Sequence, residues 1–115
     1  MKTIEKIRET LIMEIRRDSQ ESEYFEAIIE KKNLGSLKSI LKKEFGRAAK
    51  GPGKEVNLPM EIQKLVDSLG GLRIKQSFFY KKDGNRVIFA VLWPWESDSN
   101  KITLKVGVEK LDYRL

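Results

Sequence analysis

The sequence predicts an α+β domain in which an N-terminal helical part of three to four helices packs on a C-terminal three-stranded antiparallel β-meander. Near residue 72 the spacing of apolar residues changes from a helical period to strict alternation, which is typical of strands. Asp83-Gly84-Asn85 then provides a hairpin turn between two strand-like segments. The predicted organisation is one domain, 1–115, with a helical part at 1–50, a turn or linker at 51–57, a helix at 58–70 and the meander at 72–111.

The first half of the predicted helical part covers residues 3–32. Residues 3–17 carry an amphipathic stripe made of Ile4, Ile7, Leu11, Ile12 and Ile15. Asp18 and Glu21 have the spacing of a capping box, so a second helix is expected from there to a stop at Asn33-Leu34-Gly35. Its inward residues would be Tyr24, Phe25, Ile28 and Ile29. Since neither glycine nor proline interrupts residues 3–32, a single long helix stays an open alternative.

Two further helices are expected before the sheet. Ser36 can cap a third helix, which Gly51-Pro52-Gly53 follows as a turn. Its apolar stripe consists of Leu37, Ile40, Leu41, Phe45 and Ala48. Leu58-Pro59 opens the fourth helix, because proline suits the first helical position, and Gly70-Gly71 ends it. The buried side of this fourth helix is expected at Ile62, Leu65, Val66 and Leu69.

The predicted sheet has residues 86–95 as its middle strand, the longest apolar run of the chain. The face expected under the helices comprises Leu72, Ile74, Phe78, Val87, Phe89, Val91, Trp93, Leu104 and Val106. The opposite face comprises Phe79, Ile88, Ala90 and Leu92, with a basic rim of Arg73, Lys75, Lys81, Arg86 and Lys105. Three alternatives stay open for this second face: a helix of the same chain covers it, a second copy or protein partner packs on it, or it is a nucleic-acid platform.

Two tryptophans extend the candidate interface beyond that face. Trp93 and Trp95 flank Pro94 and are expected to point to the same side, where they could anchor a partner. The candidate interface residues are therefore Phe79, Ile88, Ala90, Leu92, Trp93 and Trp95.

Composition limits the chemistry that this chain can perform. The chain has neither cysteine nor histidine, which excludes disulfides, thiolate catalysis and the commonest metal ligand. We therefore expect a binding domain rather than an enzyme, with no cofactor and no metal. The N-terminus mixes charged with apolar residues, and no apolar run approaches the ~18 residues of a membrane span. The expected location is cytoplasmic, without membrane contact.

Basic residues are concentrated on the third predicted helix. The net charge is +6, and Lys38, Lys42, Lys43, Arg47 and Lys50 occupy most of this helix's polar face, with Lys54 in the following turn. Such a face can contact phosphates, although a solvated face is the simpler alternative. The candidate nucleic-acid or anion-binding residues are Lys38, Lys42, Lys43, Arg47, Lys50, Lys54, Arg73, Lys75 and Arg86.

One part of the chain resembles a known family. Residues 84–89, residues 102–107 and the terminal Asp112-Tyr113-Arg114 resemble the C-terminal sheet of RelE-type toxins, which are small basic ribonucleases that need neither histidine nor metal. The resemblance implies an RNA site at Arg73, Lys75, Arg86 and Tyr113, in which basic residues stabilise the cleaved phosphate.

Three functions are therefore predicted as alternatives. The first is a non-enzymatic binding module that contacts nucleic acid or a protein assembly through the basic helix and the rimmed sheet face. The second is a RelE-like endoribonuclease, and the third is a homodimeric structural or interaction protein.

Overall fold

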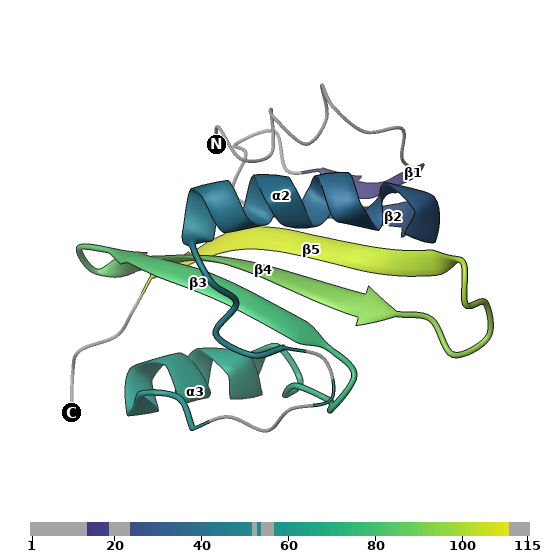
Figure 1. Ribbon diagram of the computed structural model, residues 1–115. Helices are drawn as coiled ribbons and strands as arrows, with labels where there is room; N and C mark the ends of the chain where they lie inside the picture. The colour runs from purple at the N-terminus through teal and green to yellow at the C-terminus, as the bar shows by residue number, and fades with distance from the viewer. Residues whose placement is uncertain (1–13, 19–23, 52, 54–56, 111–115) are drawn as a thin grey trace.

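The protein is a three-layer α+β structure in which one helix lies on each face of an antiparallel sheet (Figure 1). The computed structural model describes residues 14–18, 24–51, 53 and 57–110. Its strands are β1 (Glu14–Asp18), β2 (Tyr24–Glu30), β3 (Ser77–Asp83), β4 (Arg86–Pro94) and β5 (Lys101–Lys110). The sheet order is β1-β2-β5-β4-β3, so four long strands carry the short β1 at one edge.

Helix α2 (Leu34–Phe45) covers the first face of the sheet (Figure 1). It follows β2 after the short 3-10 turn Lys31–Asn33, and its side chains Leu37 and Leu41 are completely buried. They pack on a cluster contributed by four strands: Phe25, Ala27, Ile29, Phe79, Ala90, Leu92, Ile102, Leu104 and Val106. The helix ends at Gly46, whose φ of 78° suits glycine. The third predicted helix is thus confirmed, although it is shorter than its apolar stripe indicated.

Helix α3 (Met60–Ser68) covers the opposite face. It matches the predicted fourth helix, and Ile62, Leu65 and Val66 are buried as expected from the sequence. They pack on four side chains of the neighbouring strands, namely Phe78, Val87, Phe89 and Val91. Leu69, the fourth residue expected on the buried side, lies just beyond the helix and is 37% exposed. After the helix, Gly70 and Gly71 both have positive φ, a conformation that glycine adopts readily and that turns the chain out of the helical path.

The C-terminal meander is confirmed, but its first strand begins at Ser77 and not at residue 72. Leu72 and Ile74, expected on the covered face of that strand, precede it, and Ile74 is 47% exposed. Strands β3 and β4 pair with Asp83 opposite Arg86, so Gly84 and Asn85 form the tip of a tight hairpin. Strand β4 pairs with β5 along its whole length. Because β2 adds to the free side of β5, β5 and not β4 is the middle strand of the sheet.

Two predictions for the N-terminal part were wrong. Residues 24–30 form strand β2 rather than a helix, and residues 14–18 form strand β1 rather than the end of one. The part of the chain that the structure describes therefore contains two α-helices, not three to four. Most of the helix predicted at 3–17, and residues 19–23 of the next one, lie outside the described residues. Asn33-Leu34-Gly35, expected as a helix stop, instead begins α2.

The ambiguity in β2 has a physical cause. Apolar residues at Tyr24, Phe25, Ile28 and Ile29 satisfy a helical period, but they also satisfy a strand that is covered on both faces. In the structure Phe25, Ala27 and Ile29 face α2, and all three have no exposed surface. Hydrogen bonding to β5 over the full length of β2 decides in favour of the strand.

The predicted division of the sheet faces also needs correction. Leu104 and Val106 pair with Leu92 and Ala90, so they lie on the α2 side rather than with Phe89. A shift of one residue in register moves every side chain of a strand to the other face, and the length of the 95–100 connection sets that register here.

Helix α2 covers the face that contains Phe79, Ala90 and Leu92, which is the first of the three alternatives for that face. Their side chains are 5%, 0% and 3% exposed, so they are core residues that pack with α2. Ile88, nearer the hairpin, is half-buried.

Candidate nucleic-acid interface

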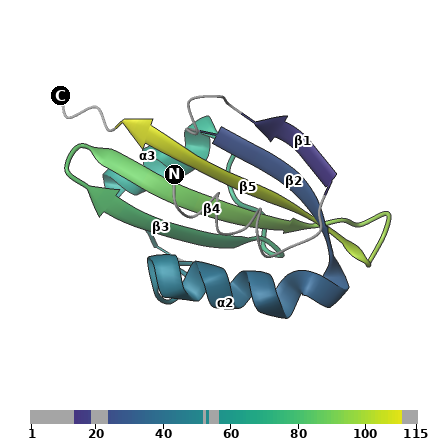
Figure 2. The ribbon, with the colours of Figure 1, turned by 90° about the horizontal axis from the view of Figure 1, so that it is seen from above.

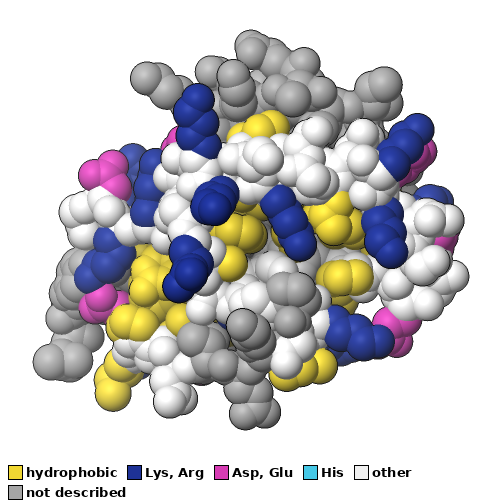
Figure 3. Space-filling model, in the orientation of Figure 1, with side chains coloured by type: hydrophobic (Ala, Val, Ile, Leu, Met, Phe, Trp, Pro, Cys, Tyr) yellow, Lys and Arg dark blue, Asp and Glu magenta, His cyan; other side chains and the backbone are white. Residues whose placement is uncertain are grey.

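The outward side of α2 carries a basic surface. Lys38, Lys42 and Lys43 are exposed on the helix, and Arg47 is exposed just beyond its end. None of these four side chains forms an ion pair with another residue that the structure describes. We call them the α2 basic face. In a view that shows α2 above the sheet and α3 below it, lysine and arginine side chains are spread widely, whereas acidic side chains lie at the margins (Figure 3).

Lys50 does not belong to that surface. It is 6% exposed, and its ammonium donates hydrogen bonds to the carbonyl oxygens of Gly51, Ile74 and Gln76 at 3.2, 2.8 and 2.6 Å. Burial lowers the pKa of Lys50, because the charged form loses its hydration. Its backbone also bridges to Phe78 of β3. Lys50 therefore ties the segment after α2 to the segment before β3. Lys54 lies outside the described residues.

Two neighbouring lysines of β3 connect the sheet to both helices. The Nζ atom of Lys81 lies 2.6 Å from the carboxylate of Glu44 on α2, and it is 5.9 Å from the centre of the Phe45 ring. Lys82 points to the opposite face and pairs with Glu61 of α3. Because these lysines are engaged with the helices, they add less positive potential to the surface than the α2 basic face does.

A second candidate surface lies on the α3 side, at the end of β4. The guanidinium carbon of Arg73 is 5.6 Å from the centre of the Trp93 ring, and the Nζ atom of Lys105 is 5.1 Å from it. The Nζ atom of Lys101 is 5.3 Å from the centre of the Trp95 ring. These are cation–π distances. We call this set of five residues the tryptophan groove.

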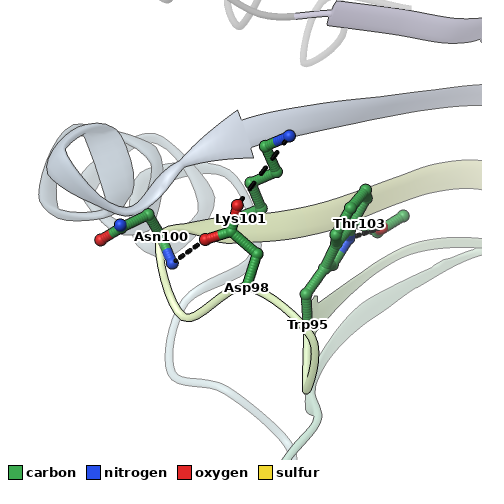
Figure 4. Close-up of polar contacts among 5 residues, drawn as sticks. All are labelled: Trp95, Asp98, Asn100, Lys101 and Thr103. Carbon is green, nitrogen blue, oxygen red and sulfur yellow. Dashed lines mark hydrogen bonds and ion pairs between the residues drawn. The ribbon is translucent and has the colours of Figure 1, made fainter.

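The connection between β4 and β5 holds the second indole in place (Figure 4). The Nε1 atom of Trp95 donates a 2.7 Å hydrogen bond to the hydroxyl oxygen of Thr103. The carboxylate of Asp98 accepts a 2.9 Å bond from the backbone N–H of Asn100, which closes the turn, and it lies 3.9 Å from the ammonium of Lys101. Trp95 is therefore oriented by a defined loop, and its indole N–H is already engaged.

Tyr24 and Gly107 border the groove on the β5 side. A Cβ atom on Gly107 would lie 2.8 Å from Cζ of Phe89 and 3.2 Å from Cδ2 of Tyr24, so the two rings close over the bare backbone of β5. The Tyr24 hydroxyl donates a 2.9 Å bond to the carboxylate of Glu26. Sequence reasoning missed Tyr24 as a groove residue because it placed this tyrosine on a helix.

Replacing Gly107 with alanine is expected to lower the free energy of unfolding by about 1–3 kcal/mol, the usual cost of overpacking. The added methyl group would meet Phe89, a ring with 1% exposure that must shift to make room for it. Urea unfolding measures the change. Gly35→Ala is the matched control, because a Cβ atom there meets nothing within 4 Å, and a helical alanine should stabilise by about 0.5–1 kcal/mol. Equal effects at the two positions would contradict the packing described around Gly107.

The residues implied by the resemblance to RelE-type toxins are not brought together. Arg73 contacts Trp93 near the end of β4, whereas Arg86 begins that strand. The seven residue-to-residue steps from Arg86 to Trp93 span about 23 Å in an extended strand. Lys75 is exposed in the connection before β3, and Tyr113 lies outside the described residues. An RNA-cleaving cluster of Arg73 with Arg86 would need a different arrangement.

Comparison with known proteins adds no relative: no family model, no curated protein and no solved structure matches this chain. Within the described ranges, no group of three or more acidic side chains is placed to hold a metal ion. Neither α2 nor α3 has the length and apolar character that crossing a membrane requires.

Proposed function

We propose that this protein is a nucleic-acid-binding module that contacts the phosphate backbone through the α2 basic face. The observation that carries the proposal is the exposure of Lys38, Lys42, Lys43 and Arg47 on one side of the molecule, without acidic partners among the described residues. Cations placed in this way bind phosphates because each contact releases condensed counterions, irrespective of base sequence.

The fold supports this role by holding α2 firmly. Leu37 and Leu41 are completely buried against the sheet, and Glu44 pairs with Lys81 of β3. The lysines therefore project from a fixed scaffold, so less conformational entropy is lost when they bind than on an unanchored helix. A homodimer through the face of Ala90 and Leu92, the earlier alternative, lacks this support because α2 occupies that face.

The salt dependence of binding tests the proposal. Wild-type protein should bind labelled DNA in fluorescence-anisotropy titrations, and the logarithm of the association constant should fall linearly with the logarithm of salt concentration. With four cations engaged on duplex DNA, the expected slope is about −3.6. The double variant Lys42→Gln/Lys43→Gln should make this slope less negative by about 1.8.

The control is Lys64→Gln/Lys110→Gln, which removes the same charge from exposed positions on α3 and at the end of β5. This control should keep nearly the wild-type slope. If both double variants change the slope equally, the positive charge acts without a defined contact surface and the proposal is wrong. Absence of binding at about 50 mM salt would also reject it.

A further inference from the structure

We infer that the tryptophan groove is a second contact site of the same ligand and that it takes unpaired nucleobases, which makes the ligand a single-stranded nucleic acid. This inference rests on the proposed function and specifies the class of nucleic acid. The groove lies on the α3 side of the sheet, whereas the α2 basic face lies on the other.

The groove has the shape for planar groups. Trp93 and Trp95 line one open hollow together with Arg73 and Thr103. A smaller hollow of about 140 Å³ adjoins it and is bordered by Trp93, Arg73, Lys105 and Tyr24. Its volume is close to that of the ~150 Å³ cavities that admit a benzene ring. One ring-sized hollow beside the Trp93 indole is suited to stacking a base.

The charge of the groove fits a polyanion. Of the described residues that line the two hollows, Arg73 and Lys105 are basic and Glu96 is acidic. Lys101 adds a third cation over Trp95. A base that stacks on an indole takes the place of a cation over that ring, and the displaced cation stays within reach of the phosphate of the base. Stacking is the contribution that every base can make. An acidic peptide would satisfy the cations but would leave the indole faces without a planar partner.

The same end of the sheet connects the groove to α2. The backbone N–H of Lys31 donates a 2.7 Å hydrogen bond to the carbonyl oxygen of Asn100, so the chain just before α2 contacts the loop between β4 and β5. In both ribbon views the start of α2 and this loop lie at one end of the molecule (Figures 1 and 2). Lys31 and Lys32 are exposed between the two surfaces. A single-stranded nucleic acid held by α2 can pass this end of the molecule and reach the indoles. A duplex cannot place its bases there, because it keeps them stacked inside.

Intrinsic fluorescence tests the inference directly, because the chain has two tryptophans and both lie in the groove. Titration with oligo(dT) or oligo(U) should change the tryptophan emission, and a duplex of equal length should change it far less. Trp93→Leu should weaken binding of the labelled single strand by about 5- to 150-fold, the range found for loss of one stacked base, whereas Trp93→Phe should retain most of the affinity. A response to oligo(dT) and oligo(U) alike indicates base stacking without use of the ribose hydroxyl.

Three outcomes would overturn the inference. The first is equal single-strand affinity for wild type, Trp93→Leu and Trp93→Phe while Lys42→Gln/Lys43→Gln still flattens the salt slope, a result that leaves the proposed function intact. The second is an equal emission change with duplex, and the third is the same change at the same affinity with poly-glutamate. If Trp93→Leu fails to fold, the exposed Arg73→Gln serves instead, and its single-strand salt slope should be less negative by about 0.7. An unchanged slope for Arg73→Gln would likewise reject the groove.

Discussion

A glutamate in place of Leu92 is expected to abolish cooperative folding at neutral pH. Leu92 is 3% exposed and lies beneath α2 in a cluster of apolar side chains. The substitution removes a buried leucine, which costs about 2–5 kcal/mol, and it adds an unpaired buried carboxylate at a cost of several kcal/mol more. The sum is comparable to the total stability of about 5–15 kcal/mol of a typical domain.

Circular dichroism and urea unfolding measure this effect, and size-exclusion chromatography distinguishes it from the loss of an interface. Ile88→Glu is the matched control: Ile88 lies on the same face but is half-buried. Ile88 is opposite Lys81, whose ammonium can pair with the new carboxylate as well as with Glu44. The control should fold. A folded Leu92→Glu variant with half the native mass in solution would show that this face contacts a second copy, contrary to the position of α2.

Replacing Lys50 with methionine is expected to lower the free energy of unfolding by about 2–3 kcal/mol. The methionine keeps most of the apolar stem but removes the ammonium from three carbonyl oxygens. The carbonyl oxygen of Ile74 still accepts a bond from the backbone N–H of Gly53, whereas that of Gln76 loses its bond in a buried position, and an unsatisfied buried group costs about 1–3 kcal/mol. Part of this loss is offset, because the variant no longer buries a charge whose pKa burial lowers.

Lys81→Met provides the comparison for Lys50→Met. Lys81 is also a lysine with an acceptor at short distance, but its side chain is 39% exposed, so loss of its ion pair should cost less than about 1 kcal/mol. Equal losses in urea unfolding of the two variants would contradict the structural role assigned to Lys50.

Local sequence signals predicted the second half of the fold well. The hairpin at Gly84, the alternation in β5 and the amphipathic α2 and α3 depend on neighbouring residues, which the sequence displays directly. Strand β2 could not be predicted in the same way. Its seven residues fit either period, and pairing with β5, some seventy-five residues later in the chain, decides between them.

The candidate site was predicted in part for similar reasons. The sequence indicates that Trp93 and Trp95 lie together, and both line one hollow. It placed Lys105 on the rim of the wrong face, because the register between β4 and β5 depends on how the 95–100 loop folds. The sequence prediction grouped Lys50 with the exposed lysines, because it continued the helical period beyond Gly46, where the helix ends.

Chemical-shift mapping on the isotopically labelled protein tests the central claim most directly. On addition of a short single-stranded oligonucleotide, we expect the amide signals of residues 38–47 and the indole N–H signals of Trp93 and Trp95 to shift together. The signals of Lys64 and Asp67, on the exposed side of α3, should stay unchanged. Shifts confined to α3, or no shifts at all under low-salt conditions, would contradict binding of a single strand to the α2 basic face and the tryptophan groove.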